Sequence, residues 1–412
     1  MVVVSIASCR SCGSRELLNR FDLGNQFFSG YFPSKGENIS HLNAPLKVVE
    51  CDNCSLSQLT HSFEPEYMYG QDYGYRSGLN PSMVMHLKKK SDILKRRYNL
   101  GSRSNILDIG SNDGTFLRNF IGCRQLVGTD PTIQNWIEFY DFEVTLISKL
   151  FDDKITEEFK DIKFDLITSI SMFYDVPDPV EFVKSISNLL TKNGVWHLEQ
   201  SYLPSMMKNM SFDTVCHEHL MYYSIRSIEN IISKFDLKII NVNLNEVNGG
   251  SFELDIARET ANYANSDKYI KEFQLAEQKF FNEKPWETFN LKFRDFKLEL
   301  YNLITNYKND GFNISCLGAS TKGNVLLQAV GIDNELVKVA GEINIHKIGK
   351  VTPGTNIEII PEKNLQVGKK EVRLVLPWHF NKFFLETQKN FIDSGGTLVF
   401  PLPKIEIINK NT

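Results

Sequence analysis

The ten residues Asn105–Gly114 constrain the fold of this chain more than any other stretch. A short apolar run surrounds Asp108, a glycine turn follows at once, and residues 115–120 resemble the start of a helix. A buried parallel strand has such a continuous apolar run, and the turn that leaves it needs glycine for unusual dihedral angles and close ligand approach. Ligands of open α/β sheets bind at the carboxyl ends of the strands. We therefore expect this turn to hold a ligand.

The spacing within this turn indicates the kind of ligand. The pattern is D-x-G-x-x-x-G, not the G-x-G-x-x-G of dinucleotide enzymes, and Asp108 and Asp113 would repel a bare phosphate. A second apolar run, Gln125–Thr129, ends in Asp130, 22 residues after Asp108, where an acid suits a ribose diol. A cationic nucleoside, S-adenosylmethionine, fits this pattern better than NAD. Any doubly wound domain with a tight first turn remains the alternative. The residues predicted to bind the cofactor are Asp108, Gly110, Asn112, Gly114 and Asp130.

Strand and helix patterns continue to alternate after this turn. We expect strands at 144–147, 164–169 and 195–199, helices at 180–190 and 227–235, and two final strands at 238–244 and 251–257. Five parallel units closed by an antiparallel hairpin form the sheet of a class I methyltransferase. The predicted fold class is therefore α/β, with this Rossmann-like sheet flanked by a small N-terminal zinc-binding domain and a C-terminal Rossmann-like α/β domain.

Two C-x-x-C pairs precede this sheet. Cys9 and Cys12 form the first, Cys51 and Cys54 the second, and 38 residues separate the pairs. Two such pairs are what a tetrahedral zinc ion requires, and a reducing compartment favours zinc over disulfides. All four ligands are protein side chains, so the predicted zinc site is closed and structural. A disulfide pair or free thiols remain the alternative, and a loop or hairpin is expected between the pairs.

The segment from Tyr67 to Asn80 is aromatic and polar, and its glycines argue against a regular helix. Its tyrosines could wall a pocket around a polar ligand, or the segment could be a packed loop that joins two domains. A helix is expected from Pro81 to about Tyr98. Its basic residues are expected to form a solvated face: Lys88, Lys89, Lys90, Lys95, Arg96 and Arg97.

A second strand–turn–helix pattern begins at Asn313, after helices that we expect over 261–309 with an interruption at Pro285. Its turn, Gly318–Asn324, has two glycines, hydroxyls and a lysine but no acid, which is typical of phosphate binding. Lys322 could instead be a surface lysine at a helix start. Further strands are expected at 336–340, 373–376 and 397–400. Two nucleotides of different character are therefore expected on the two units.

With 412 residues the chain is expected to hold three domains, at 1–66, 67–260 and 261–412. The formal net charge of −4 provides no basic field for a nucleic acid polymer or an anionic membrane. No apolar run approaches the roughly 20 residues of a membrane helix. The apolar start, 1–7, lacks a basic region before it and is expected to be a strand, not an export signal. These features predict a cytoplasmic protein that is a monomer or a weak homodimer.

The segment Phe212–Tyr223 places two of the eight histidines, His217 and His219, around Glu218. An imidazole beside a carboxylate can be tuned as a general base. The spacing is not the H-E-x-x-H of a zinc protease, and no third metal ligand lies nearby in the sequence. A capped turn with satisfied side chains is the alternative.

Taken together, these motifs resemble the bacterial sugar-nucleotide C-methyltransferases, which add a branch methyl to a TDP-linked 4-keto-6-deoxysugar. The resemblance covers essentially the whole chain. It rests on the paired C-x-x-C, on 106–114, 212–223 and 318–324, and on 344–347 with 353–355.

The resemblance places the family's catalytic pair on Glu218 and His219 and its active-site tyrosines on Tyr73 and Tyr75. This chain has Cys216 where those relatives have a tyrosine, and Asp175 where they have a histidine. The expected reaction removes a proton from C3 of the sugar, beside the 4-keto group, and the enolate carbon then takes the methyl group. His219 is the expected base, Glu218 orients it, and His217, Tyr73 or Tyr75 holds the oxyanion.

The nucleotide-sugar substrate is expected on Ser320, Lys322, Asn324 and Lys347. An O-methyltransferase acting on polysaccharide or capsule sugars needs the same cofactor and a base, and it is the nearest rival. A zinc-ribbon binding protein with a degenerate methyltransferase fold would have little reason to keep Asp108, Gly110 and Asp130. The formal net charge of −4 disfavours a methyltransferase that acts on nucleic acid.

Overall fold

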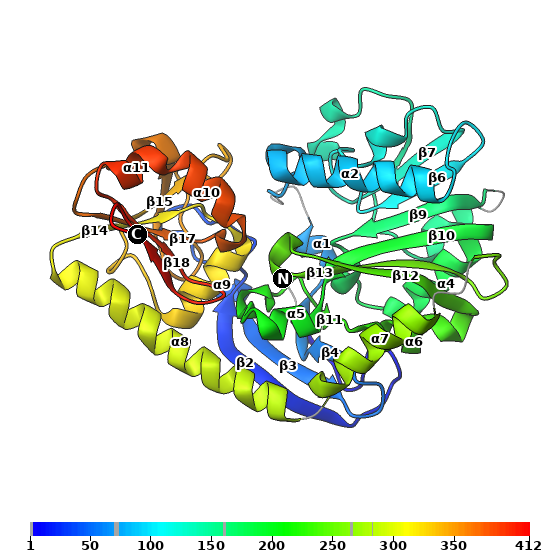
Figure 1. Ribbon diagram of the computed structural model, residues 1–412, viewed down its shortest axis with the longest axis horizontal. Coiled ribbons are helices and arrows are strands. Elements are labelled where there is room, and N and C mark those ends of the chain that lie inside the picture. Colours follow the sequence, from blue (N-terminus) through cyan, green and yellow to red (C-terminus); the bar gives the residue numbers. More distant parts are fainter. Residues whose placement is uncertain (1–2, 70–73, 160–161, 264–266, 282) are drawn as a thin grey trace.

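The computed structural model describes residues 3–69, 74–159, 162–263, 267–281 and 283–412. Within these ranges the strands form four sheets, shared among an N-terminal unit, a methyltransferase sheet and a C-terminal unit (Figure 1). The N-terminal strands lie between and below the other two units in this view. No helix in the described ranges is both long and apolar enough to cross a membrane.

The largest sheet follows the predicted class I topology. Its strand order is β12-β13-β10-β9-β6-β7-β8, and β13 runs antiparallel to both of its neighbours while the β6, β7, β8, β9 and β10 pairings are parallel. The strands are β6 (Asn105–Ile109), β7 (Gln125–Thr129), β8 (Thr145–Ile147), β9 (Phe164–Ile170), β10 (Leu190–Ser201), β12 (Leu237–Asn245) and β13 (Ser251–Arg258). The prediction of five parallel strands closed by an antiparallel hairpin is confirmed.

Successive side chains of these strands enter different cores, because side chains alternate across a pleated sheet. Ile106 packs with Met83 and Leu87 of α2 (Pro81–Arg97), whereas Leu107 belongs to the core beneath α4 and α6. The remaining helices of this unit are α3 (Asp153–Glu158), α4 (Pro179–Leu189), α5 (Leu203–Lys208), α6 (Ile225–Ile232) and α7 (Asp267–Glu277). Residues Leu117–Phe120, where a helix start was expected, form a single 3₁₀ turn.

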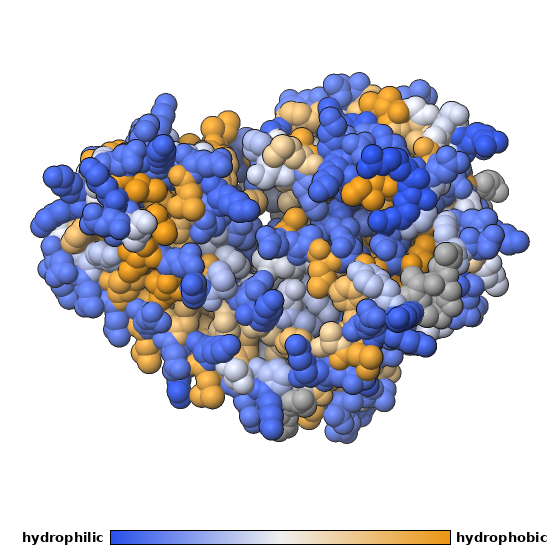
Figure 2. All heavy atoms as spheres, in the orientation of Figure 1, coloured by the Kyte–Doolittle hydropathy of each residue, from blue (hydrophilic) through white to orange (hydrophobic). Residues whose placement is uncertain are grey.

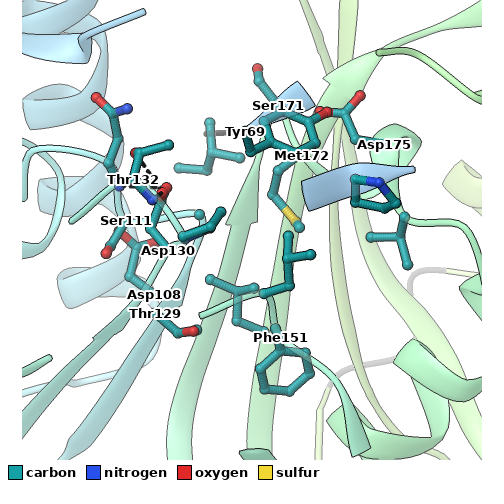
Figure 3. A pocket seen from close by; sticks show the side chains of 18 of the residues that line it. Tyr69, Asp108, Ser111, Thr129, Asp130, Thr132, Phe151, Ser171, Met172 and Asp175 are labelled. Carbon is teal, nitrogen blue, oxygen red and sulfur yellow. Dashed lines mark hydrogen bonds between the residues drawn. The ribbon is translucent and has the colours of Figure 1, made fainter. Parts of the chain in front are cut away.

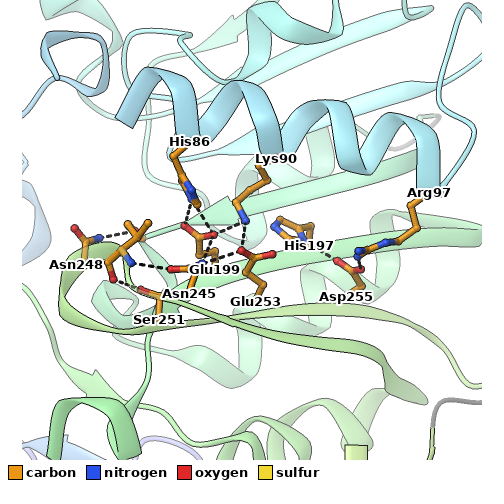
Figure 4. Close-up of polar contacts among 12 residues, drawn as sticks. His86, Lys90, Arg97, His197, Glu199, Asn245, Asn248, Ser251, Glu253 and Asp255 are labelled. Atoms are coloured by element: carbon orange, nitrogen blue, oxygen red, sulfur yellow. Dashed lines mark hydrogen bonds and ion pairs between the residues drawn. The ribbon is translucent and has the colours of Figure 1, made fainter. Parts of the chain in front are cut away.

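The basic face of α2 is solvated in part, since Lys88, Lys89 and Arg96 are exposed as predicted, but two other residues are paired with acids. Lys90 is buried and pairs with Glu199 and Glu253, and Arg97 pairs with Asp255 (Figure 4). These acids lie on β10 and β13, far along the chain from the lysine run. A helical pattern alone cannot reveal that a facing sheet supplies carboxylates, which make burial of a lysine tolerable.

The sheet of the N-terminal unit includes one strand from the middle of the chain. Its four-stranded sheet has the order β11-β4-β3-β2, and Met221 and Tyr222 of β11 pair with Gln58 and Ser57. The elements are β1 (Val3–Ser5), β2 (Leu17–Phe27), β3 (Asn43–Cys51), β4 (Ser57–Leu59), β5 (His61–Phe63), α1 (Pro65–Met68) and β11 (Met221–Tyr222). This pairing ties the predicted catalytic segment to the cysteine-bearing strands.

The C-terminal unit has the strand order β16-β15-β14-β17-β18-β19, parallel except for β19. Its elements are α8 (Glu283–Asn309), β14 (Asn313–Leu317), α9 (Thr321–Val330), β15 (Val339–Glu342), β16 (Glu358–Pro361), β17 (Glu371–Val375), α10 (Asn381–Thr387), α11 (Lys389–Asp393), β18 (Thr397–Phe400) and β19 (Glu406–Ile408). Strands β16 and β19 were not predicted, and β15 begins three residues later than expected. Pro285 does not interrupt a helix but lies in the first turn of α8, where its missing N–H is tolerated.

Candidate active site

A cavity of about 530 Å³ opens at the carboxyl ends of β6, β7 and β9 (Figure 3). Of the residues predicted to bind the cofactor, Asp108, Gly110, Asn112 and Asp130 line it. Gly114 is not among the lining residues and packs against Tyr140 instead. A Cβ added to Gly114 would lie 2.7 Å from the ring of that tyrosine. The cavity therefore lies where the sequence predicted a ligand. We call it the donor cavity, because the ligand expected there is a methyl donor.

Glycine is required at the first turn position. Gly110 has φ +77°, and an added Cβ would lie 2.9 Å from Cγ of Met172. Asn112 follows with φ +49°, a conformation that asparagine tolerates better than most residues. These left-handed positions bend the turn sharply back over the end of β6.

Two buried carboxyl groups shape the floor of the donor cavity. Thr168 donates to Oδ1 of Asp108 at 2.6 Å, and burial raises the pKa of Asp108 to about 7. Asp130 accepts hydrogen bonds from the backbone N–H of Asn112 (3.0 Å) and from the N–H and hydroxyl of Thr132 (2.7 and 2.6 Å). Since a carboxylate has about four lone-pair sites, Asp130 keeps capacity for one further donor.

The side chain of Asn112 is engaged with the tyrosine segment. Its Oδ1 accepts from the N–H of Ser77 at 2.9 Å, and its Nδ2 donates to the carbonyl of Tyr75 at 3.1 Å. Tyr69 and Tyr75 both line the donor cavity, so this segment walls the pocket. Tyr73, predicted as an active-site residue, lies outside the described residues.

His219 lies beside the loop that leaves β9. Its ring centroid is 4.1 Å from that of Tyr174, and the N–H of Leu220 donates to the carbonyl of Tyr174 at 2.9 Å. Nδ1 of His219 lies 2.7 Å from the carbonyl of Thr214. A carbonyl only accepts, so Nδ1 carries the proton and Nε2 is the nitrogen that can take another.

Electrostatics keep this imidazole neutral near pH 7. Burial and the ammonium group of Lys322 lower the pKa of His219 to about 3. Burial raises the pKa of Glu218 to about 7. His219 donates the hydrogen bond that orients its ring to the backbone carbonyl of Thr214, which occupies the position expected for Glu218.

His217 faces a different part of the molecule. Its Nε2 lies 3.2 Å from the carbonyl of Ala44, and its ring packs against Phe28 and Phe63 in the N-terminal unit. Burial lowers the pKa of His217 to about 4. The structure therefore brings Glu218 and His219 to the junction of the units and leaves His217 in a core.

Lys322 connects the C-terminal unit to His219. Its Nζ donates to Oγ1 of Thr214 (3.2 Å) and to the carbonyl of Asn248 (2.7 Å), so Thr214 contacts both the lysine and the imidazole. Figure 2 shows the surface hollowed between the C-terminal unit and the methyltransferase sheet, above this junction. The roles of Thr214 and Asn248 carried no sequence signal, because each contributes a backbone oxygen and the hydroxyl that Thr214 adds is a common side-chain group.

The other predicted substrate residues have protein partners. Ser320 caps α9 by accepting from the N–H of Gly323 (3.0 Å), and Asn324 is fully buried and donates to the carbonyl of Ser29 (2.8 Å). Nζ of Lys347 donates to the carbonyl of Ala319 at 2.8 Å. Although the turn itself holds no acid, Glu342 accepts from the N–H of Ala319 at 2.8 Å, so this amide is already occupied.

The four cysteines meet as predicted. Sγ of Cys9 lies 3.5 Å from that of Cys54, and Sγ of Cys12 lies 3.5 Å from that of Cys51. All four sulfurs lie within 4.8 Å of one another and none is in a disulfide. Zinc–sulfur bonds of about 2.3 Å in a tetrahedron put sulfurs a little under 4 Å apart, so the donor set fits zinc. Lys234 and Asn230 donate to the carbonyls of Ser11 and Cys54, which fixes the knuckles against the methyltransferase unit.

Models of protein families match the chain in three consecutive segments. Residues 9–69 match the family described as "Putative zinc binding domain", residues 85–242 match "Methyltransferase domain", and residues 246–403 match "C-methyltransferase C-terminal domain".

The C-methyltransferase below is similar to this chain along its whole length, and the other two proteins are similar to part of it. The chain is 27% identical over 420 residues to the C-methyltransferase NovU of Streptomyces niveus, covering 99% of this chain and 98% of NovU. A tRNA U34 carboxymethyltransferase of Campylobacter jejuni is 31% identical over 124 residues, which cover 28% of this chain and 41% of that protein. A solved S-adenosylmethionine-dependent methyltransferase of Clostridium acetobutylicum has 16% identity and a TM-score of 0.34, covering 42% of this chain and 92% of that one. The chain is therefore similar along its whole length to a C-methyltransferase, and it matches in order the models of a zinc-binding domain, a methyltransferase domain and a C-methyltransferase C-terminal domain.

Proposed function

We propose that this C-methyltransferase acts on a nucleotide-linked 4-keto-6-deoxy sugar, in the biosynthesis of a branched sugar. The observation that carries the proposal is the position of His219. Its neutral imidazole lies between the loop that borders the donor cavity and Lys322 of the C-terminal unit, and Thr214 contacts both groups. A base with a cation on one side and a methyl-donor cavity on the other suits an anionic nucleotide sugar whose carbon is to be alkylated.

In the proposed mechanism Nε2 of His219 removes the C3 proton of the sugar. The 4-keto group makes this proton acidic, because the electron pair of the C–H bond delocalises onto the ketone oxygen. The carbonyl of Thr214 holds Nδ1–H and stabilises the imidazolium that forms. S-adenosylmethionine bound in the donor cavity supplies the electrophilic methyl group. We assign its binding to the turn at Gly110 and to the carboxyl groups of Asp108 and Asp130.

The proposed division of labour assigns residues 1–66 to zinc binding, 67–260 to methyl transfer and 261–412 to the nucleotide sugar. Within the last segment, Lys322 is the basic group beside His219, and Lys347 adds a second buried ammonium over the ring of Phe32, 4.3 Å from its centroid. Burial lowers the pKa of both lysines. A diphosphate would reduce that penalty, because it would add negative charge to that of Asp213 near Lys322 and Glu342 near Lys347.

Turnover of a panel of 4-keto sugar nucleotides tests this function. We expect a mass increase of one methyl group on a thymidine diphosphate-linked 4-keto-6-deoxyhexose or a close relative, with a quaternary C-methyl signal in the NMR spectrum. A methoxy signal would assign the protein to O-methylation instead. A lack of turnover on every keto nucleotide would overturn the proposed substrate class.

Replacing Lys322 with methionine is expected to weaken binding of the nucleotide sugar about ten- to a hundredfold, the usual range for losing one charge-assisted hydrogen bond. Calorimetric titration with thymidine diphosphate measures the loss, and titration with S-adenosylhomocysteine should give an unchanged Kd. The same substitution at the exposed Lys338 serves as the control. An equal loss for both ligands would contradict the separate assignment of the two units.

A further inference from the structure

Asp175 is a cavity-lining acid that the mechanism above leaves without a role. It ends the 3₁₀ turn Phe173–Asp175 that follows β9, and it lines the donor cavity opposite Asp130 (Figure 3). Tyr69, which also lines the donor cavity, interacts with this carboxyl group. Its Oδ1 is buried and has no hydrogen-bond partner among the described residues. An orphaned carboxyl oxygen at a cavity wall is available to a ligand.

The residue pairs Tyr174–Asp175 and Glu218–His219 lie against each other. Tyr174 contacts His219 through its ring and accepts the N–H of Leu220, so the two segments are held in register. Asp175 interacts electrostatically with Glu218, whose Oε2 is also buried without a partner in the described part of the chain. The wall beside His219 therefore carries two carboxyl groups.

These carboxyl groups have acidic or neutral surroundings. The titratable groups that interact with Asp175 are Glu218, Tyr69, Tyr174, Cys216, Tyr222 and Tyr223. No cation is paired with either carboxyl in the described ranges. Burial and Glu218 hold the pKa of Asp175 well above its usual range. Burial and the neighbouring acid therefore favour retention of a proton by this pair.

We propose that Asp175 is a further catalytic residue, whose carboxylic acid donates a hydrogen bond to the ketone oxygen of the acceptor while His219 removes the adjacent proton. This inference rests on the proposed function and deepens it, because it restricts the acceptor to a neutral carbonyl at this wall. A phosphate would be repelled by the acid pair, whereas it is attracted at Lys322. Of the oxyanion donors that the sequence suggested, His217 is buried against Phe28 and Phe63, whereas Tyr75 lines the donor cavity and could act together with Asp175.

The electron flow is balanced without a further reagent. The C3–H bond breaks and its proton goes to Nε2 of His219, while the electron pair forms the C3–C4 double bond and the C4–O π pair moves to oxygen. The Asp175 O–H stabilises that oxygen and keeps its proton. When C3 attacks the methyl group of S-adenosylmethionine, the S–CH3 bond would break with its electron pair left on sulfur, so that S-adenosylhomocysteine leaves. The C4–O double bond reforms at the same time, and His219 returns its proton to solvent.

Exchange of the C3 proton with deuterium oxide tests the role of Asp175 on a thymidine diphosphate-linked 4-keto-6-deoxyhexose. Asp175→Leu should exchange about a hundredfold more slowly, the usual loss for one oxyanion donor. Asp175→Asn keeps a donor of the same shape and should retain much of the rate. It should also lose the alkaline fall of the pH profile, because the wild-type acid stops donating once it ionises. Equal rates and pH profiles in all three proteins would overturn the proposal.

The infrared stretch of the acceptor ketone, labelled with ¹³C, separates this inference from the proposed function. In the His219→Asn background, which leaves the acceptor unreacted, we expect a lower stretching frequency when Asp175 is present than in Asp175→Leu. If the shift is seen but wild-type enzyme forms no C-methyl product, the Asp175 hydrogen bond is supported and the proposed reaction is overturned. A C-methyl product without any difference in the shift would overturn the role of Asp175 alone.

Discussion

Replacing His219 with asparagine should slow exchange of the acceptor's C3 proton, and methyl transfer with it, by about a thousandfold, the middle of the range for a general base. Asparagine preserves much of the shape of the imidazole but cannot accept a proton at the Nε2 position. The pKa of His219, lowered to about 3, keeps the wild-type ring neutral and ready to act near pH 7. Deuterium incorporation followed by NMR measures the loss.

His217→Asn is the matched control for this prediction. It makes the same change two residues away, in a ring that packs against Phe28 and Phe63 and faces the carbonyl of Ala44. We expect a lower melting temperature with exchange rates within a few-fold of wild type. If His219→Asn exchanged normally, or if both variants lost exchange equally while still binding S-adenosylhomocysteine, His219 would not be the base.

Replacing Cys51 with serine should remove the zinc ion and lower the melting temperature by about 10 °C or more. The binding energy of a structural zinc ion is folding energy, since the unfolded chain has no preformed site. Cys51 ends β3, and the knuckle that it begins leads into β4, which pairs with β11 just after His219. Loss of zinc is therefore expected to lower methyl transfer as well as stability. Zinc content by elemental analysis and thermal unfolding measure the two effects.

Cys123→Ser provides the control for zinc loss, because Cys123 lies outside the four-sulfur cluster. It should keep the full zinc content and melt within a few degrees of wild type. Chelation of the wild-type protein should reproduce the Cys51→Ser result, and re-addition of zinc should restore it. A Cys51→Ser protein with wild-type melting behaviour would show that the site contributes little to the fold.

The sequence alone predicted the parts of the molecule that depend on local patterns. The apolar run at 105–109 and its glycine turn predicted the first strand and the donor cavity, and the two C-x-x-C pairs predicted the sulfur cluster. These predictions were successful because strand burial, positive φ at Gly110 and knuckle geometry each follow from a few adjacent residues.

The active-site wall could not be predicted in this way. His217 and His219 are equivalent in the sequence, yet one faces a phenylalanine core and the other faces Tyr174. The sequence showed Asp175 only as a departure from the pattern of the relatives. Nothing in the sequence indicated that Asp175 and Glu218 lie next to each other. Both histidines lie in the turn before β11, where the ring of His217 contacts the carbonyl of Ala44 and the ring of His219 contacts the carbonyl of Thr214. These backbone contacts set the two orientations.

The sequence by itself determined the sheet topology, the glycine turn that lines the donor cavity and the cluster of four cysteines, since each depends on periodicity or spacing within one segment. Only the tertiary structure decided the protonation of His219, the burial of Lys90 and the proximity of Lys322 to Thr214, which are 108 residues apart. The physical reason is that desolvation and charge pairing depend on which distant segments exclude water together.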